Sequence, residues 1–411
     1  MYPPAIILDC EMRSQEGIIQ PLGRMGVRIV ALSSHVDCPA FHSRYVNKTI
    51  LSPSLSNNEE DFIAFLCQLP EKGVLFYSDD ISAVAISRYQ QRLKDAGYLL
   101  NIAANADLET AFDKWHCYQL AQSIGIPMAK TQVVTSPDDI VSVWQAFEKP
   151  VMLKGTRLAG GNYPLLSSKD QISAAWQTLQ TAINSEGFKA RQSGIILQEW
   201  HSYEITDNWS CEALYTKEGV PVDFFPIKRI RTSVNRNGTF SSRLYAGHYE
   251  HNQQLIETTE LILTKLNWKG FAHVEYFYVP KLKRFLLTEI NPRLPGYSYY
   301  PGSSGFNLAY YYYADLTGIQ LTRPAPFPKS IYFEAFLYPG DITAAFNHVA
   351  MGRLNLLSFL TSYLQIFRPG TITILEPLRL DDPGFSVHVI MANLRSFLNN
   401  VRNFLSKWLR K

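Results

Sequence analysis

The 411-residue sequence has few cysteines and no long apolar run, and each scarcity argues against a class of protein. Its five cysteines, Cys10, Cys38, Cys67, Cys117 and Cys211, are scattered, with no Cys-x-x-Cys pair. This pattern argues against a disulfide framework or a cysteine metal site and favours buried thiols in a reducing compartment. No segment approaches the roughly 20 uninterrupted apolar residues of a membrane span, and the amino terminus lacks the basic region of a signal peptide. We therefore expect a cytoplasmic protein.

Charge is also scarce, with 18% charged residues and a net charge of +3. Together with 46% hydrophobic residues, this argues against a disordered chain. Neither the small positive charge nor the tyrosine-rich stretch 297–313, which lacks a basic patch, favours a nucleic-acid partner. The first strand–turn, DCEMRSQEG, has no G-x-G-x-x-G, which disfavours a Rossmann dehydrogenase.

The hydrophobic pattern divides the chain into successive units, and its length leads us to expect two or three domains. Strand and helix patterns alternate over the first ~105 residues, as in parallel sheets. A helix is predicted over 108–125, ending at Gly125 with Pro127 beyond it, and it opens a small α+β module. From 205 to 290 the pattern is mostly strand, interrupted by one helix over 254–267. Asp79-Asp80 precedes a helix, where capping is the favoured role and contact with substrate the alternative.

Two strands with carboxylates carry the clearest chemical signal. GFAHVEYFYV and RFLLTEINPR predict a hairpin, which would place Glu275 and Glu289 on neighbouring strands. Glu289, Asn291 and Arg293 alternate, so they share one face. Mg²⁺ takes oxygen ligands, typically one or two carboxylates with substrate phosphates. We expect a metal site at Glu275, Glu289 and Asn291, with Arg293 stabilising charge beside it.

Basic residues and a glycine pair come earlier in the chain. Lys154 ends an apolar strand and precedes GTRLAGG, where backbone N–H groups near Gly160-Gly161 can close over phosphate. A paired glycine alone is a weak signal, and Lys114 read alone is a solvated helix charge. In IKRIR, alternation separates Lys228 from Arg229 and Arg231, so one face of that strand reaches the site. The catalytic group that we predict consists of Arg293, Lys228 and Arg231.

An apolar strand that runs into Gln198-Glu199-Trp200 can hydrogen-bond an adenine edge through its backbone, and Glu204 can take ribose hydroxyls. Read alone, this segment is a strand leaving a core. The order of all these pieces resembles the ATP-grasp superfamily from about residue 109 to 320. Within it the sequence is most similar to the carboxylate–amine ligase branch that includes D-aspartate ligase. SRYV (43–46), YSDD (77–80), GIPMAKT (125–131), INPRLPG (290–296) and LDDPGF (380–385) carry that likeness.

The resemblance implies α/β and α+β architecture: an ATP-grasp fold with an N-terminal Rossmann-like parallel-sheet domain and a helical C-terminal extension. The implied boundaries are 1–108 for the Rossmann-like domain, 109–204 for the small lid subdomain, 205–325 for the large metal-binding subdomain and 326–411 for the extension. It implies that Lys114 and Lys154 contact nucleotide phosphates, and that Gly160 and Gly161 lie in the phosphate loop. The loop GTRLAGGN is less glycine-rich than many grasp loops, and HSYE lacks the common glycine before the ribose acid.

For the nucleotide base the resemblance implies an adenine hinge at Gln198, Glu199 and Trp200 and a ribose contact at Glu204. The implied activity is ATP-dependent joining of a carboxylate to an amine through an acyl phosphate, with Mg²⁺ or Mn²⁺, and the implied partners are small acids and amines of amino-acid or peptide-like kind. A small-molecule kinase on the same fold and a non-catalytic ATP-binding protein at a membrane remain open alternatives. A homodimer is expected on general grounds.

The C-terminal residues 391–411 have an amphipathic helical pattern. Apolar residues recur at i, i+3, i+4 and i+7, and the opposite face is basic. Packing on the protein or on a second subunit is the favoured interpretation. The alternative is peripheral contact with the inner face of the membrane, in which the apolar stretch 354–367 can share.

Overall fold

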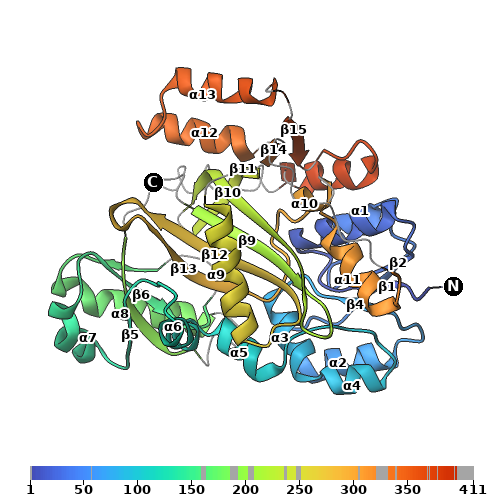
Figure 1. Ribbon diagram of the computed structural model, residues 1–411, viewed down its shortest axis with the longest axis horizontal. Coiled ribbons are helices and arrows are strands. Elements are labelled where there is room, and N and C mark those ends of the chain that lie inside the picture. The colour runs from blue at the N-terminus through green and yellow to red at the C-terminus, as the bar shows by residue number, and fades with distance from the viewer. Residues whose placement is uncertain are drawn as a thin grey trace, which may run out of the picture.

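The computed structural model describes most of the chain and builds it from three sheets (Figure 1). The described residues are 2–56, 58–158, 163–185, 193–201, 208–235, 238–246, 251–303, 306–320, 332–337, 340–367, 369, 371–376, 378–392 and 394–395.

The N-terminal unit is a parallel sheet with strand order β3-β2-β1-β4. Its inner strands are apolar and buried along their whole length, as expected where helices cover both faces. Its elements are β1 (Ala5–Ile7), α1 (Glu16–Arg24), β2 (Ile29–Ser33), β3 (Lys48–Leu51), α2 (Glu59–Gln68), β4 (Val74–Phe76), α3 (Asp80–Arg88), α4 (Gln90–Asp95) and α5 (Asn105–Phe112). Asp79 caps α3, as predicted, by accepting a hydrogen bond from the backbone N–H of Ile81.

The helix predicted over 108–125 is two helices, α5 and α6 (Lys114–Ser123). They are separated at Asp113, whose side chain accepts hydrogen bonds from the N–H groups of Trp115 and His116 and so begins α6. Lys114 therefore lies in the first turn of a helix instead of in the middle of one.

The second unit is a four-stranded antiparallel sheet with order β5-β8-β6-β7 and two helices. It has a hydrophobic core of its own, which includes Leu153, Trp176 and Leu197. Its elements after α6 are β5 (Thr131–Val134), α7 (Pro137–Val143), β6 (Val151–Gly155), β7 (Leu165–Leu166), α8 (Ile172–Ser185) and β8 (Ile195–Glu199).

The third unit is a seven-stranded sheet with order β13-β12-β9-β10-β11-β14-β15. Its strands are β9 (Asn208–Tyr215), β10 (Pro221–Asn235), β11 (Gly238–Ala246), β12 (Gly270–Val279), β13 (Arg284–Asn291), β14 (Tyr332–Leu337) and β15 (Thr371–Glu376). Its helices are α9 (Asn252–Lys265), α10 (Tyr299–Ser303), α11 (Leu308–Thr317), α12 (Gly340–Ala350) and α13 (Leu356–Ser362). Because β14 and β15 join this sheet, it continues past residue 325, where the sequence led us to end the large subdomain.

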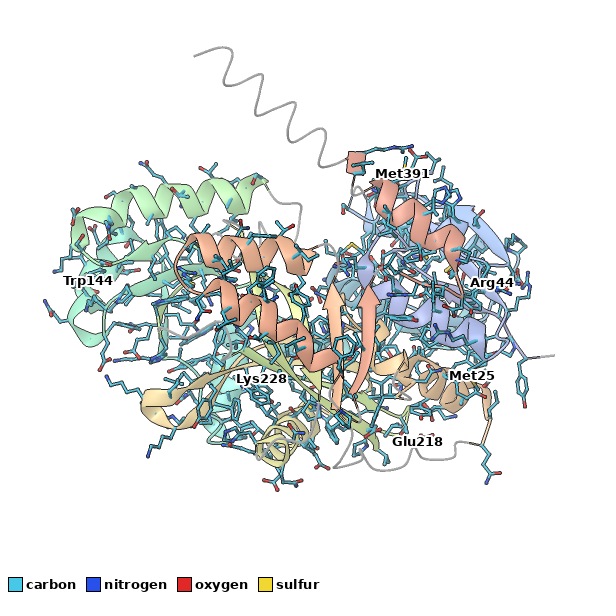
Figure 2. The ribbon with its side chains drawn as sticks, turned by 90° about the horizontal axis from the view of Figure 1, so that it is seen from above. Met25, Arg44, Trp144, Glu218, Lys228 and Met391 are labelled. Carbon is cyan, nitrogen blue, oxygen red and sulfur yellow. The ribbon has the colours of Figure 1, made fainter. Side chains whose placement is uncertain are left out.

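The N-terminal unit and the large sheet share one hydrophobic core, in which Phe76 and Tyr312 pack against Phe271. A helical segment over 383–392 lies beside the N-terminal unit, and Figure 2 shows it between Met391 and Arg44. Within the described part of the chain no helix is both long and apolar enough to span a bilayer. The predicted amphipathic helix lies outside the described residues from 396 onward.

Candidate active site

The predicted carboxylate hairpin is present and has the predicted register. Glu275 on β12 pairs directly with Glu289 on β13, and His273 pairs with Asn291 two positions along. Because alternate residues of a strand share a face, these four side chains lie together on one side of the sheet. Asn291 Nδ2 donates to Glu289 Oε1 at 3.5 Å and to His273 Nδ1 at 3.4 Å.

His273 is a member of this group that the sequence argument did not single out. Its Nε2 hydrogen-bonds with the Tyr297 hydroxyl at 2.9 Å, and the same hydroxyl is 2.8 Å from Ser210 Oγ. Burial, followed by the positive charges of Arg229 and Arg293, holds the pKa of His273 well below its usual value. A neutral histidine here orients Asn291 and Tyr297 without adding positive charge to the carboxylates. The alternation of His273 with Glu275 was the signal that could have found it.

Arg229, not either of the two cations predicted on β10, contacts the carboxylates. Its Nη2 lies 2.8 Å from Glu275 Oε2, and both groups are largely buried. Burial alone would lower the pKa of Arg229, but Glu275 and Tyr297 raise it, so the guanidinium stays charged. The predicted Lys228 lies over the ring of Trp209, with Nζ 5.1 Å from its centroid, between the lid at Trp144 and the N-terminal unit at Arg44 (Figure 2).

The predicted Arg231 lies in a separate cluster. Its Nη1 donates to Asp341 Oδ2 at 2.7 Å and its Nη2 to Ser362 Oγ at 3.1 Å, which ties β10 to α12 and α13. The pairing of β10 with β11 shifts register on both sides of Arg231. This irregularity separates Arg231 from Arg229, although simple alternation places them on one face.

Arg293 links the carboxylate strand to the N-terminal unit. Its Nη2 donates to Asp80 Oδ2 at 2.9 Å, so Asp80 contacts the site while Asp79 caps the helix. Burial raises the pKa of Asp80, and the Arg293 charge opposes that shift. Among the described residues, Arg293 Nε and Asp80 Oδ1 are buried without a hydrogen-bond partner. Buried polar groups of this kind need partners, which a bound substrate can supply.

Two lysines lie within the electrostatic influence of Glu289. Burial lowers the pKa of Lys154 to about 8, with a further contribution from the charge of Lys114, while Glu289 opposes it. Burial also disfavours charge on Lys114, but Tyr163, Glu289 and Asp80 outweigh it and raise its pKa. Lys154 Nζ donates to Gln198 Oε1 at 2.9 Å, and Lys114 Nζ donates to the carbonyl of Leu158 at 3.0 Å. The predicted phosphate lysines and the predicted metal ligands therefore act on one another electrostatically.

Part of the predicted nucleotide site lies outside the described residues. Gly160, Gly161 and Glu204 are in that part of the sequence. In the hinge, the N–H groups of Glu199 and Trp200 donate to the carbonyls of Lys130 and Pro150, at 2.9 and 3.2 Å. These two N–H groups are used within the lid, so an adenine contact there would rely on carbonyl oxygens. The adenine and ribose contacts stay predictions.

The oxygen ligands fit a hard divalent cation. The amide hydrogens of Asn291 are directed to His273 and Glu289, so neither of these contacts uses its Oδ1. Two carboxylates and an amide oxygen are ligands that Mg²⁺ accepts, with water and phosphate completing its shell. Among the described residues no group of three or more His, Cys, Asp and Glu side chains is placed to hold a metal ion by itself. A metal held partly by a nucleotide agrees with both observations.

A Rossmann-like sheet, a small antiparallel lid and a large antiparallel sheet bearing paired carboxylates form the ATP-grasp fold. Solved structures with this architecture match most of the chain. The N5-carboxyaminoimidazole ribonucleotide synthetase from Thermus thermophilus matches with a TM-score of 0.60 and 17% identity over 79% of this chain and 81% of that one. The beta-gamma-ATP complex of biotin carboxylase from Campylobacter jejuni matches with a TM-score of 0.63 and 12% identity over 77% of this chain and 72% of that one.

The N5-carboxyaminoimidazole synthetase from Staphylococcus aureus, complexed with ADP, matches with a TM-score of 0.59 and 15% identity over 78% of this chain and 79% of that one. No protein-family model matches the sequence, and no curated protein matches it. At these identities the likeness establishes the fold, as the sequence predicted. The finer likeness to D-aspartate ligase stays a prediction.

Proposed function

We propose that the protein is an ATP-dependent ligase that joins a carboxylate to an amine through an acyl phosphate. One observation carries the proposal: in the facing pair, Glu289 acts electrostatically on Lys114 and Lys154, and Glu275 acts on Arg229 and Arg293. This arrangement offers carboxylates for a metal–nucleotide complex and cations for anionic substrates. Structures of similar fold are named as synthetases and carboxylases, and several hold adenine nucleotides.

The reaction brings two anions together. A carboxylate oxygen of the acid attacks the γ-phosphorus of ATP, the bond from that phosphorus to the β,γ-bridging oxygen breaks, and ADP leaves with the electron pair. When bound, Mg²⁺ at Glu275, Glu289 and Asn291 supplies positive charge to the phosphates. Lys154 and Lys114 hold the phosphate oxygens, and Arg293 holds the acid beside them.

The second half of the reaction forms the amide. The neutral amine attacks the carbonyl carbon of the acyl phosphate, a C–N bond forms, and the C–O bond to phosphate breaks. Inorganic phosphate leaves with the electron pair, and the amine nitrogen loses a proton. Arg293 and Arg229 steady the negative charge that develops on the carbonyl oxygen. The lid, which has its own core, closes over the site and excludes water from the anhydride.

The test is ADP release with Mg-ATP and pooled carboxylates, with hydroxylamine as the trapping nucleophile. We expect hydroxamate from one acid pool, and we expect Glu289→Gln to lower its rate by about 100-fold or more, because one metal carboxylate is lost. Glu260→Gln on the exposed face of α9 is the matched control and should keep the wild-type rate.

Release of ADP together with a stable phosphate ester, and without hydroxamate, would show that the protein is a kinase and not a ligase. Hydroxamate formation by Glu289→Gln at the wild-type rate would remove Glu289 from the metal site.

A further inference from the structure

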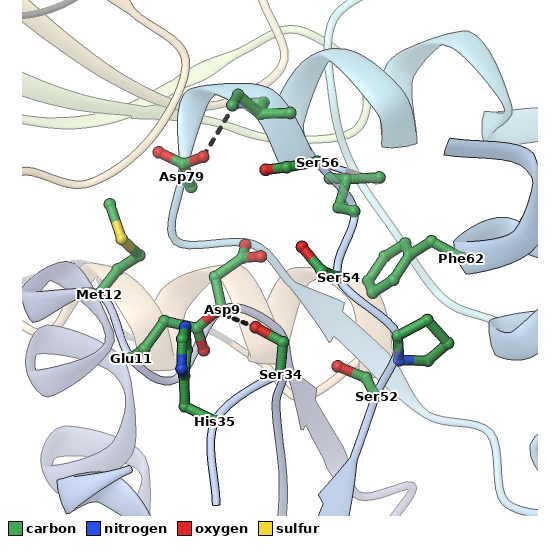
Figure 3. Close-up of a pocket in the computed structure, with 13 residues that line it drawn as sticks. Asp9, Glu11, Met12, Ser34, His35, Ser52, Ser54, Ser56, Phe62 and Asp79 are labelled. Atoms are coloured by element: carbon green, nitrogen blue, oxygen red, sulfur yellow. Dashed lines mark hydrogen bonds between the residues drawn. The ribbon is translucent and has the colours of Figure 1, made fainter. Parts of the chain in front are cut away.

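A cavity of about 240 Å³ lies at the carboxyl ends of β1 and β2, beside the active site (Figure 3). In open parallel sheets, ligands bind in this crevice. A cavity of this volume suits a small metabolite. Figure 3 shows the carboxyl groups of Asp9 and Asp79 and the hydroxyl of Ser54 turned toward the same space.

The cavity carries negative charge that no lining residue neutralises. Asp9, Glu11 and Asp79 line it, and none of its described lining residues is lysine or arginine. Burial, with the nearby charges of Asp79 and Glu11, raises the pKa of Asp9 to about 7. A cation in the cavity would relieve this repulsion, whereas a carboxylate or phosphate would increase it.

Hydroxyl groups complete the lining. Ser34 donates to Glu11 Oε1 at 3.2 Å, and Ser52 and Ser54 are half-buried in the cavity wall. Within the described chain the hydroxyls of Ser52 and Ser54 make no hydrogen bond with another side chain. They can serve a ligand that has polar hydrogens. The cavity is therefore built for a small polar cation.

Two consecutive residues, Asp79 and Asp80, connect the cavity with the candidate active site. Asp79 lines the cavity, and Asp80 receives the hydrogen bond from Arg293, which follows the carboxylate strand β13. The site thus has a cationic side, with Arg229, Arg293 and two lysines, and an anionic side in this cavity. A ligase that joins an acid to an amine needs this separation, because each substrate is then attracted to a different side.

We propose that this cavity binds the amine substrate, and that this substrate is a small amine without an acidic group, such as an amino alcohol or a diamine. The proposal rests on the proposed function and narrows its amine from the amino-acid class that the sequence indicated. An amino acid would bring its own carboxylate against Asp9, Glu11 and Asp79.

The first measurement is calorimetric binding of 1,4-diaminobutane, 2-aminoethanol and glycine to the full chain, in the absence of ATP. We expect the diamine and the amino alcohol to bind at least tenfold more tightly than glycine. Asp9→Asn and Glu11→Gln should each weaken that binding about tenfold, while Asp37→Asn, on an exposed loop residue nearby, should leave it unchanged.

The second measurement separates this proposal from the ligase itself. Hydroxamate formation by the wild type at saturating hydroxylamine reports acid activation. The KM for the bound amine should rise about tenfold in Glu11→Gln and stay at the wild-type value in Asp37→Asn. Failure of the wild type to form hydroxamate would refute the ligase, and the calorimetry would still decide the cavity. Absence of binding by both cationic probes, or equal binding by Asp9→Asn, Glu11→Gln and the wild type, would refute the amine site.

Discussion

At the scale of single residues, the site contains charges that favour the folded state and charges that oppose it. Lys114 and Lys154 are both buried near Glu289, yet their pKa values shift in opposite directions. Lys114 has enough acidic neighbours to stay charged at little cost, and Lys154 does not. Side chains that bind substrate often carry a charge that destabilises the folded protein, because their position serves binding and not stability.

We predict that Lys154→Met stabilises the protein at pH 7 by at most about 3 kcal/mol, since the pKa is lowered from 10.5 to about 8 and each pKa unit corresponds to about 1.4 kcal/mol. The unfolded chain holds this amine near its ordinary pKa of 10.5 and the folded state at about 8, so the unfolded state binds more protons between these values. Wild-type stability should therefore rise between pH 8 and pH 10, and the variant should lose that rise. Urea unfolding at several pH values measures both effects.

Lys114→Met is the matched comparison, because the raised pKa of Lys114 means that its charge stabilises the fold below that pKa. It should be less stable than the wild type at pH 7, and both variants should bind Mg-ATP at least tenfold more weakly. Equal destabilisation by the two substitutions would contradict the electrostatic account.

Most residues of the candidate site could be predicted from residue type and spacing. The contacts that could not be predicted have physical reasons. Glu275, Glu289 and Asn291 were predictable because the period of a strand decides which face a side chain takes. Contact of Asp80 with substrate was only an alternative to capping, and its pairing with Arg293, like that of Tyr297 with His273, could not be predicted, because these contacts join segments whose packing no local pattern reports. The separation of Arg231 from Arg229 was hidden by a strand irregularity, which sequence alternation cannot show.

At the scale of elements, strand β10 contains two buried arginines that form ion pairs with different parts of the molecule. Arg229 reaches the carboxylates, and Arg231 reaches α12. His348 on α12 adds a hydrogen bond between its Nε2 and the carbonyl of Thr232, at 2.8 Å. Because of the register shifts around Arg231, β10 contributes Arg229 to the site and also contacts α12 and α13 through Arg231. Helix and strand types were predictable here, but the addition of β14 and β15 to the large sheet was not, because pairing between distant strands leaves no local signal.

The ion pair Arg231–Asp341 predicts a structural role that can be separated from a catalytic one. Arg231→Met should destabilise the protein by about 3–5 kcal/mol, because Asp341 is left buried without its cation. The double variant Arg231→Met/Asp341→Leu should recover most of that stability, and its hydroxamate rate should stay within about threefold of the wild type. Denaturant unfolding and the hydroxamate assay together measure this. A double variant that is stable but inactive would restore the catalytic role that the sequence led us to predict for Arg231.

At the scale of the whole molecule, the lid is set apart while the other two units are joined. The shared core of the N-terminal and large sheets holds the cavity near the carboxylates, whereas the four-stranded sheet of the second unit has a core of its own. The segment that begins at residue 378 strengthens the joined part. Asp382 accepts a hydrogen bond from the Arg44 N–H at 3.0 Å, and Asp381 accepts one from Arg24 Nε at 2.7 Å. The motif LDDPGF (380–385) was one of the segments that resemble the ligase branch. Its two aspartates bind the C-terminal segment to the N-terminal unit.

Arg379 lies where the three joined parts meet, and its replacement tests whether they unfold together. Its side chain is fully buried, its Nη2 donates to Glu16 Oε2 on α1 at 2.8 Å, and its Cζ lies 3.3 Å from the ring centroid of Tyr299 on α10. Arg379→Met should cost about 3–5 kcal/mol, because the buried Glu16 carboxylate loses the guanidinium that pairs with it at 2.8 Å. If the parts form one cooperative unit, the unfolding transitions followed by tryptophan fluorescence and by far-UV circular dichroism should move together to lower urea. Arg353→Met, at an exposed arginine, should leave both transitions in place. A variant in which the two transitions separate would show that the C-terminal segment holds the units side by side without making them one cooperative structure, and the amine cavity would then be free to move relative to the carboxylates.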